Sequence, residues 1–250
     1  MAFMLHTRPG FVPPEPQGRY RAYLAGDEAA LERTQRLRFE VFNLELREGL
    51  AESASIGLDR DRFDPVCDHL IVESTDTDRV IGTYRLQTGL TARANHGFYS
   101  EQEFDFTPFE THRSEILELG RACVDRDHRN LAVLGLLWRG IARYAVLNDC
   151  RYLIGCSSLS SRDPAEGRAL YESLPDDMLA AEEFRTVPQP GWACEGGVSD
   201  GPAPKIPRLM HTYLLLGAKV CGPPALDPQF GTIDFLTLMD VRQIPARYFR

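Results

Sequence analysis

The chain has 250 residues, of which 43% are hydrophobic, and a formal net charge of -8. This length suits one large domain or two small ones, and this apolar content is enough to build a core. The acidic balance, with a pI of about 5.3, argues against general nucleic-acid binding, which needs a broad basic surface.

The sequence shows no membrane-spanning or secretory segment. No apolar run approaches the roughly 20 residues that cross a bilayer, and the start MAFMLHTRPGFVPPEPQ lacks the apolar middle of a signal peptide. We therefore expect a cytoplasmic location. Six scattered cysteines without a CxxC pair predict neither a disulfide framework nor a zinc site, and most are expected to be packed thiols: Cys67, Cys123, Cys150, Cys156, Cys194 and Cys221.

The first half of the chain predicts an arm, a helix and a hairpin. Residues 1–19 are rich in proline and are expected to form a flexible arm before a single domain at 20–250. A strand is predicted at 20–25, followed by a helix from Asp27 to about Leu46. The apolar stretches at 69–73 and 80–88 then read as an antiparallel hairpin.

The segment 114–161 predicts a strand, a crossover helix and a second strand. ILELGRACV and RYLIGCS are short and apolar, while residues from Val133 onward repeat at helical spacing. This order is typical of a βαβ unit. Further along, we expect a helix from Asp163 to before Pro175, a long loop at 188–207, and strands at 211–216 and 233–238.

Several charged residues lie where they require an explanation. Arg85 falls in the middle of a strand, and a half-buried arginine normally needs a carboxylate partner. Acidic residues at 101, 103 and 105 either supply that partner or face water. The cluster Asp59, Asp61, Asp64 and Asp68 indicates either a site for a cationic substrate or a turn-rich loop.

The turn at 125–130 carries two arginines just before the central helix. Backbone N–H groups at a helix start, joined by Arg126 and Arg129, form a seat suited to a phosphate. The alternative interpretation is a solvent-exposed helix cap whose arginines have no binding role.

The order of elements resembles the GNAT N-acyltransferase fold, an α/β (α+β) architecture with a mixed central sheet flanked by helices. More narrowly, LRFEVF, FDPVCDHLIV, VIGTYRL, YSEQEFD, ELGRACV, LLWRGIARY, GCSSLSSRDP and CGPPALDPQFGTIDF resemble the ornithine-lipid synthase branch, sometimes labelled haemolysin-like. This branch is similar to the acyl-homoserine-lactone synthases. The resemblance covers residues 20 to 250 and implies an N-acyltransferase that uses an acyl carrier protein thioester.

One departure from the fold bears on the acyl donor. The phosphate turn usually follows Arg-x-x-Gly-x-Gly/Ala, but here Arg129 is followed by Asn130, Leu131 and Ala132. Glycines are missing where a backbone approaches pyrophosphate closely, which argues against tight coenzyme A binding. A phosphopantetheine arm has one phosphodiester and no nucleotide, so the turn favours a carrier protein donor. No cofactor is expected besides this thioester substrate.

The resemblance and the chemistry of amide formation together suggest a set of site residues. Glu118 is expected to be the base, and a bulge at Gly120 would bring Arg121 into the same pocket. The oxyanion donors are expected near Cys123 and Val124, and Tyr171 is either the acid for the thiolate or a packed aromatic. The expected contacts to an amino-acid acceptor come from Arg38, Asp64, Asp68, Arg85 and Arg121.

The carrier protein is acidic and needs a basic landing surface. The expected contacts to the carrier and its phosphopantetheine arm are Arg126, His128, Arg129, Asn130, Leu131, Arg139 and Arg143. The predicted function is transfer of a (3-hydroxy) fatty acyl group to the amine of an amino acid, with ornithine as the leading candidate. Alternatives are an acyl-homoserine-lactone synthase, a coenzyme A-dependent acetyltransferase and a non-catalytic membrane-interacting protein. For the enzyme itself, peripheral contact with the inner membrane face is a further expectation.

Overall fold

The computed structural model describes residues 9–196 and 201–244. Its centre is one mixed sheet with the strand order β1-β2-β3-β4-β5-β8-β6, and β7 pairs with β8. The strands are β1 (Tyr20–Leu24), β2 (Asp68–Ser74), β3 (Arg79–Thr88), β4 (Ile116–Val124), β5 (Tyr152–Leu159), β6 (Lys219–Val220), β7 (Ala225–Asp227) and β8 (Thr232–Asp240). The α-helices are α1 (Glu28–Phe39), α2 (Ser53–Ile56), α3 (Gly89–Ala94), α4 (Leu131–Leu147), α5 (Pro164–Glu172) and α6 (Arg208–Leu215).

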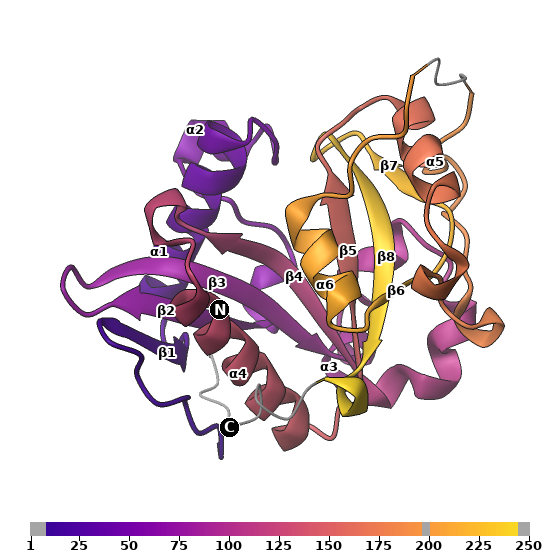
Figure 1. Ribbon diagram of the computed structural model, residues 1–250. Coiled ribbons are helices and arrows are strands. Elements are labelled where there is room, and N and C mark those ends of the chain that lie inside the picture. The colour runs from indigo at the N-terminus through magenta and orange to yellow at the C-terminus, as the bar shows by residue number, and fades with distance from the viewer. Residues whose placement is uncertain (1–8, 197–200, 245–250) are drawn as a thin grey trace.

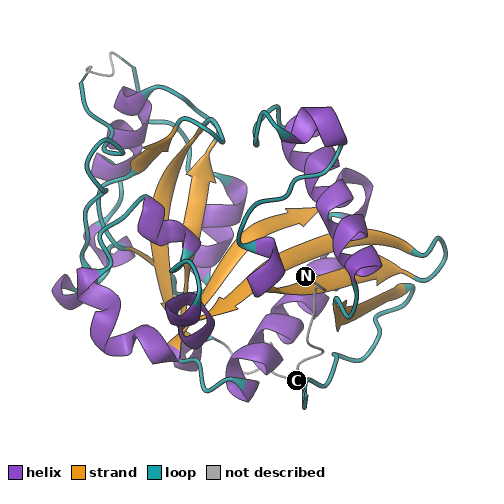
Figure 2. Cartoon of the chain, turned by 180° about the vertical axis from the view of Figure 1, so that it is seen from behind, coloured by secondary structure: helices purple, strands orange, loops and turns teal. Residues whose placement is uncertain are grey.

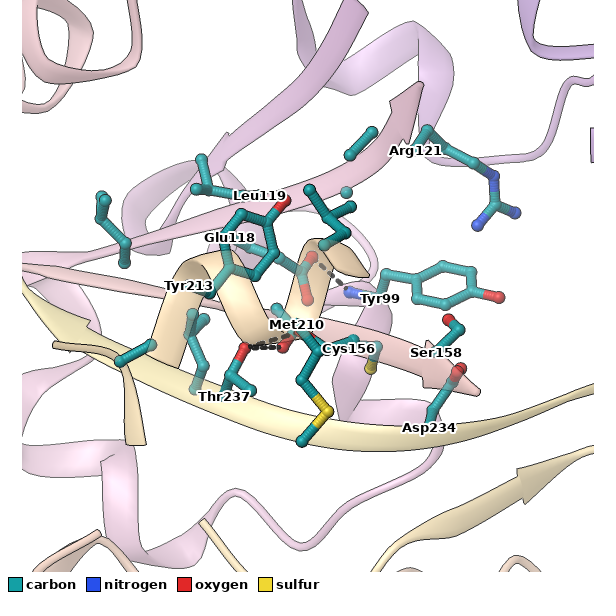
Figure 3. Close-up of a pocket in the computed structure, with 18 of the residues that line it drawn as sticks. Tyr99, Glu118, Leu119, Arg121, Cys156, Ser158, Met210, Tyr213, Asp234 and Thr237 are labelled. Atoms are coloured by element: carbon teal, nitrogen blue, oxygen red, sulfur yellow. Dashed lines mark hydrogen bonds between the residues drawn. The ribbon is translucent and has the colours of Figure 1, made fainter. Parts of the chain in front are cut away.

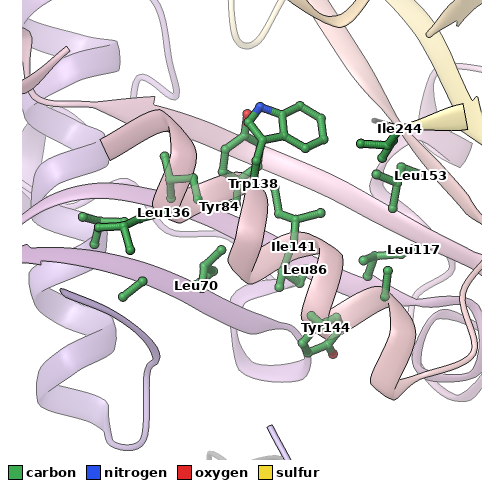
Figure 4. Packing of buried hydrophobic residues seen from close by; sticks show 14 of the residues in the cluster. Leu70, Tyr84, Leu86, Leu117, Leu136, Trp138, Ile141, Tyr144, Leu153 and Ile244 are labelled. Atoms are coloured by element: carbon green, nitrogen blue, oxygen red, sulfur yellow. The ribbon is translucent and has the colours of Figure 1, made fainter. Parts of the chain in front are cut away.

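Helices α1 and α4 cover opposite faces of the N-terminal half of the sheet (Figures 1 and 2). Strand β2 shows why: Leu70 and Val72 pack in the core under α4, whereas Ile71 packs in the core under α1. Successive side chains of a strand point to opposite faces, so a fully apolar strand is buried on both sides. Figure 4 shows the α4 face, where Trp138, Ile141 and their neighbours fill the space above the sheet.

The sheet divides between its two central strands. Strands β4 and β5 are the one parallel pair among the described strands, and their pairing runs only from Ile116↔Tyr152 to Glu118↔Ile154. Beyond that point the two halves of the sheet separate, as Figure 2 shows. At the division an added Cβ on Gly155 would lie 2.3 Å from the Leu119 carbonyl oxygen, so only glycine allows this close approach.

Most predicted elements are present, with corrected ends. The hairpin β2–β3, the helix that starts at Asp163 and the last strand β8 are confirmed. Asp27 caps α1 as predicted, accepting a hydrogen bond from the Ala30 N–H at 2.7 Å. That helix ends at Phe39, however, and the chain continues to Glu45 as a π-helix, η1 (Glu40–Glu45).

The predicted strand at 211–216 is wrong, because these residues belong to helix α6. Their apolar residues follow helical spacing, so Met210 is buried while Tyr213 and Leu214 pack beside it. Helix α6 lies across the C-terminal half of the sheet (Figure 1). No described helix combines the length and the apolar character that a membrane crossing requires.

The predicted arm is in part packed. Residues 1–8 lie outside the described residues, but Phe11 contacts the core beside Tyr144 with ring centroids 6.4 Å apart. Arg143 on α4 donates hydrogen bonds to the carbonyls of Val12 and Pro13. The arm is therefore packed against α4 at residues 11–13, through Phe11 and the hydrogen bonds from Arg143.

Candidate active site between strands β4 and β5

A cavity of about 260 Å³ opens where β4 and β5 separate (Figure 3). One wall is the β4 segment 118–122, and the other is formed by β5 and β8. Helix α6 contributes Met210 and Tyr213, while Phe230 closes a further side. The cavity is mainly apolar, with a few polar side chains that converge on it, as is usual for a site that binds a small molecule.

Glu118 is the carboxylate at the point of division. Its side chain is 5% exposed and lines the cavity. One carboxylate oxygen accepts a hydrogen bond from the Tyr99 N–H at 2.8 Å, and the other accepts bonds from the N–H and hydroxyl of Ser100. Burial raises the pKa of Glu118, although these hydrogen bonds oppose the rise.

These hydrogen bonds also give Glu118 a structural role. Tyr99 and Ser100 begin the 3-10 helix η3 (Tyr99–Gln102), so the carboxylate satisfies N–H groups at a helix start. Glu118 therefore holds η3 against the cavity while keeping its own carboxylate in a fixed position. A fixed buried carboxylate with a raised pKa suits a general base that works near neutral pH.

Arg121 enters the same cavity through a bulge in β4. The pairing with β3 goes from Arg85↔Gly120 to Thr83↔Cys123, so Arg121 and Ala122 together face Tyr84. Arg121 takes a left-handed backbone conformation with φ 48°. The expectation that a bulge brings Glu118 and Arg121 into one pocket is thus met, one residue later than Gly120.

Behind Arg121 lies a buried set of three arginines and three aspartates, here called the balanced cluster. Its members are Arg38, Asp59, Asp61, Asp64, Arg85 and Arg121.

Each guanidinium of the balanced cluster contacts two of the carboxylates. Arg38 lies 2.7 Å from Asp59 and 2.8 Å from Asp64. Arg121 lies 3.3 Å from Asp59 and 3.0 Å from Asp61. The arginines hold the pKa values of Asp61 and Asp64 below the usual range despite burial.

The balanced cluster corrects three predicted substrate contacts. Arg38, Asp64 and Arg85 pair within the cluster, and none of them lines the cavity. The carboxylate partners of Arg85 are Asp61 at 2.7 Å and Asp64 at 3.1 Å, in place of the acidic residues at 101–105. Of the five residues expected to contact the acceptor, Arg121 is the one on the cavity wall.

Asp68 also lies away from the cavity. Its carboxylate accepts a hydrogen bond from the Tyr144 hydroxyl on α4. The sequence could not separate Asp68 from Asp64, because both follow the same acidic loop. The difference arises at the start of β2, which turns Asp68 toward α4.

A second acidic set lies at the far end of the cavity. The carboxylates of Glu103 and Asp234 and the thiol of Cys156 place their ligand atoms within 4.8 Å of one another. Asp234 and Cys156 line the cavity, where Figure 3 shows them beside Ser158. Burial, the first cause, and the nearby charge of Asp227 raise the pKa of Asp234 to about 6.

Sequence reasoning missed this second set. Glu103 was expected either to pair with Arg85 or to face water, and Cys156 was expected to be a packed thiol. Asp234 was not singled out, although one signal was available: it is a lone acid in TIDFLTL, an otherwise apolar and hydroxyl-bearing strand. A carboxylate buried in such a strand needs a partner or a function.

The expected phosphate seat at the start of α4 is occupied by the chain itself. The Asn130 side chain accepts hydrogen bonds from the N–H groups of Ala132 and Val133, at 3.0 and 3.1 Å. Arg129 pairs with Glu45 at 2.7 Å and donates to the Val124 carbonyl. The turn is thus closer to the interpretation of a capped helix than to that of an open phosphate seat.

The other expected donor contacts divide into exposed and engaged residues. Arg126 and Leu131 are exposed, with 75% of the Arg126 side chain and 86% of Leu131 accessible. His128 contacts the Tyr20 hydroxyl at 3.2 Å. Arg139 folds back along α4 toward Gly135, and its Nη1 would lie 3.2 Å from an added Cβ there. Arg143 holds the arm, so it is not a free landing residue.

Three proposed catalytic positions lie outside the cavity lining. Cys123 is buried in the core under α1, and Val124 packs against the core under α4. Tyr171 packs beside Leu170 and other apolar residues of the C-terminal half. The β4 residues that line the cavity end at Ala122, where the bulge redirects the strand, so the backbone N–H groups of Cys123 and Val124 lie outside the cavity lining.

Comparison with known proteins places this architecture in a family. Residues 37–139 match the model of the acetyltransferase (GNAT) domain. The chain is 33% identical over 246 residues to the L-ornithine N(alpha)-acyltransferase of Agrobacterium fabrum, covering 92% of this chain and 84% of that protein. The chain belongs to the L-ornithine N(alpha)-acyltransferase family. It is 31% identical to the Brucella abortus member, over 92% of this chain and 88% of that protein.

Solved structures support the fold of this acyltransferase. FeeM, an N-acyl amino acid synthase from uncultured soil microbes, gives a TM-score of 0.54 at 11% identity, covering 93% of this chain and 98% of that one. The acyl-homoserine-lactone synthase LasI gives a TM-score of 0.53 at 12% identity, over 92% and 94%. The predicted GNAT-like fold is therefore confirmed.

Proposed function

We propose that this family member transfers a fatty acyl group from acyl carrier protein to the α-amine of ornithine. The cavity at the division of β4 and β5, with the buried Glu118 at its apex, is the observation that carries the proposal. A slot between two separating strands accepts a narrow thioester arm and leaves the carbonyl beside Glu118. The names of the relatives supply the acceptor and the amide-forming chemistry.

The reaction forms one C–N bond and breaks one C–S bond. The neutral amine attacks the thioester carbonyl, and the tetrahedral intermediate collapses with loss of the thiolate. Glu118, directly or through water, receives the proton that the amine loses, and the same proton is then returned to the leaving thiolate, which departs as a thiol. The apolar walls exclude bulk water, which protects the thioester from hydrolysis.

Two features support a carrier protein donor. The first is the Asn130 cap, which occupies N–H groups that a pyrophosphate would need. The second is a set of exposed side chains at the end of η1 and at the turn before α4, here called the landing surface: Leu46, Arg47, Arg126 and Leu131. Leu46 lines the cavity and is 44% exposed, while the Arg129–Glu45 pair joins η1 to the turn before α4. Exposed arginines beside apolar side chains suit an acidic carrier protein.

The direct test is to incubate purified protein with 3-hydroxyacyl carrier protein and a panel of amino acids, and to identify products by mass. Acyl-ornithine is the expected product. An acyl-homoserine lactone from S-adenosylmethionine, or an amide formed only from acetyl-coenzyme A, would reject the proposal. A peripheral position at the inner membrane face stays a prediction, which flotation with liposomes tests.

Glu118→Gln tests the base. Loss of a general base lowers kcat by about 10²- to 10⁴-fold, with little change in the KM of either substrate. Glu115→Gln, just before β4 and with its side chain 44% exposed, is the matched control and should keep full activity. Because Glu118 also holds η3, circular dichroism must show that the variant is folded. An unchanged kcat in folded protein removes Glu118 from the chemistry.

Arg47→Glu and Arg126→Glu test the landing surface. Each reversal should raise the KM for acyl carrier protein about tenfold, since each places a negative charge against an acidic partner. A short acyl-pantetheine thioester lacks the protein, so its KM should not change. Arg93→Glu, an exposed position on α3, is the control. Equal KM changes for both donors would contradict the landing surface.

A further inference from the structure

The acidic set at the far end of the cavity has unused hydrogen-bonding capacity. One carboxylate oxygen of Glu103, one of Asp234 and the Thr232 hydroxyl are buried without a hydrogen-bond partner of good geometry in the described chain. Glu103 and Thr232 are fully buried, and Asp234 is 4% exposed. Asp234 is on the cavity wall, whereas Glu103 and Thr232 lie behind that wall. Buried polar atoms are normally satisfied, so these orphaned oxygens indicate a missing donor.

The charge of the cavity indicates what kind of donor is missing. Among the described lining residues, the carboxylates belong to Glu48, Glu118, Asp227 and Asp234, and Glu103 lies directly behind Asp234. The one cationic side chain in that lining, Arg121, already contacts Asp59 and Asp61. A buried surplus of negative charge is costly unless a cation completes it.

Asp227 lies nearby, but its carboxylate already accepts hydrogen bonds from the chain. One of its carboxylate oxygens accepts hydrogen bonds from the N–H groups of Gln229 and Phe230, at 2.8 and 2.9 Å. Its second oxygen lies 3.4 Å from the Tyr99 hydroxyl. Asp227 therefore shapes the turn after β7 and adds negative potential, while Glu103 and Asp234 keep the free oxygens.

We propose that Glu103 and Asp234 bind the side-chain ammonium of a diamino acid acceptor and thereby select its α-amine for acylation. This inference rests on the proposed function and adds the element that distinguishes two chemically similar amines. An ammonium offers three N–H donors, which suit the unpaired oxygens of the Glu103 and Asp234 carboxylates and the nearby Thr232 hydroxyl. The amine held there stays protonated and cannot attack, whereas the α-amine remains near Glu118.

The strand register places the two ends of such an acceptor in one cavity. Glu118 pairs with Ile154, and Cys156 follows two residues later on the same strand, about 7 Å along it. The Cys156 sulfur lies within 4.8 Å of the Glu103 and Asp234 carboxylates. Figure 3 shows Glu118, Cys156 and Asp234 around one space. The distance along β5 between Glu118 and the acidic set therefore suits an acceptor whose two amines are separated by a few carbon atoms.

A metal ion is the rival occupant, because two carboxylates and a thiol are all potential ligands. A thiol binds metal as thiolate, but burial and the adjacent carboxylates raise the pKa of Cys156 well above its usual value. The site also opens toward the acceptor cavity, where a substrate group can reach it. An organic ammonium therefore fits these residues better than a divalent metal.

The test measures binding and turnover of ornithine against norvaline, which has the same side chain without the amine. By titration calorimetry without donor, wild type should bind ornithine about 10- to 100-fold more tightly than norvaline. Glu103→Gln and Asp234→Asn should each remove most of that preference, and the kcat/KM ratio should fall in parallel. Asp240→Asn, on the same strand but paired with Arg151, is the matched control and should keep the preference.

The outcomes separate this inference from the proposed function. Equal binding of ornithine and norvaline by wild type, or an unchanged preference in both variants, overturns the ammonium site even if acyl-ornithine forms. The expected binding pattern without amide product from any donor supports the site and overturns the transfer activity. Stoichiometric metal in the purified protein, with activity lost to a chelator and restored by that metal, reassigns the three residues and overturns the inference.

Discussion

The balanced cluster and the acidic set are both buried groups of charged side chains, yet they behave in opposite ways. In the balanced cluster three arginines face three aspartates, and the pKa values of Asp61 and Asp64 are lowered. In the acidic set Glu103 and Asp234 face each other without a cation, and both pKa values are raised. Burial opposes ionisation in both places, so the presence or absence of arginine decides the direction.

This contrast distinguishes structural charge from binding charge. The balanced cluster connects α1, the loop at 59–64 and strands β3 and β4, and it leaves few acceptors for a ligand. The cluster stabilises the β4 bulge, and this bulge places Arg121 on the cavity wall. The acidic set leaves carboxylate oxygens unsatisfied at and just behind the cavity wall, which costs stability and provides affinity for a cation.

The largest expected effect comes from breaking the balanced cluster. Arg38→Met leaves Asp59 and Asp64 short of a buried cation, so the free energy of unfolding should fall by about 3–5 kcal/mol. Urea denaturation followed by circular dichroism measures it. Arg36→Met, two residues away on α1 and with its side chain 54% exposed, should change stability by less than about 0.5 kcal/mol. A loss below about 1 kcal/mol in Arg38→Met would show that the cluster is not structural.

His69 links the balanced cluster to pH. It lies 3.0 Å from the Asp64 carbonyl, and burial followed by the nearby arginines lowers its pKa to about 4. The unfolded chain, with a histidine pKa of about 6.5, binds this proton first. Stability from His69 is therefore complete above about pH 6.5 and falls by about 3 kcal/mol toward pH 4.

His69→Gln removes that contribution to the pH dependence. The difference in unfolding free energy between wild type and variant should therefore shrink by about 3 kcal/mol between pH 7 and pH 4. Comparing the two proteins cancels the titration of all other groups. A difference that is constant over this range would show that His69 is not buried in its neutral form.

Removing charge from the acidic set should increase the free energy of unfolding, whereas breaking the balanced cluster should decrease it. The folded pKa of Asp234 is raised to about 6, so its carboxylate destabilises the protein increasingly as pH rises from about 4 through 6. Asp234→Asn should therefore add about 1–2 kcal/mol of stability at pH 7.5 and almost none at pH 4. Thermal unfolding at both pH values measures the gain. A destabilised variant at pH 7.5 would mean that the charge has a partner in the free protein.

Tyr171 belongs to neither group and gives the smallest expected effect. It packs in the C-terminal core outside the cavity lining. Tyr171→Phe keeps that packing and should leave kcat within about twofold of wild type. A tenfold loss in steady-state turnover would return Tyr171 to the role of thiolate acid.

Local patterns in the sequence predicted much of the fold and part of the site. Helical spacing identified α4, Asp27 and Asp163 marked helix starts, and the apolar runs marked β2, β3, β4, β5 and β8. Glu118 and Arg121 would point to opposite faces of a regular strand, because the side-chain period is two. The prediction that they share a pocket therefore required a bulge between them, and the structure has one. The strand predicted at 211–216 failed because its residues carry apolar side chains at spacings that fit a helix as well as a strand.

By itself, the sequence determined the elements, the family motifs and the need for a carboxylate beside Arg85, since these depend on neighbours along the chain. The tertiary structure alone decided which carboxylates those were, and which charges remained unpaired. Asp61 lies 24 residues from Arg85, and Asp234 is more than 130 residues from Glu103. Pairing and desolvation at such separations depend on how the sheet divides, so the same residue type is structural in one half and free to bind in the other.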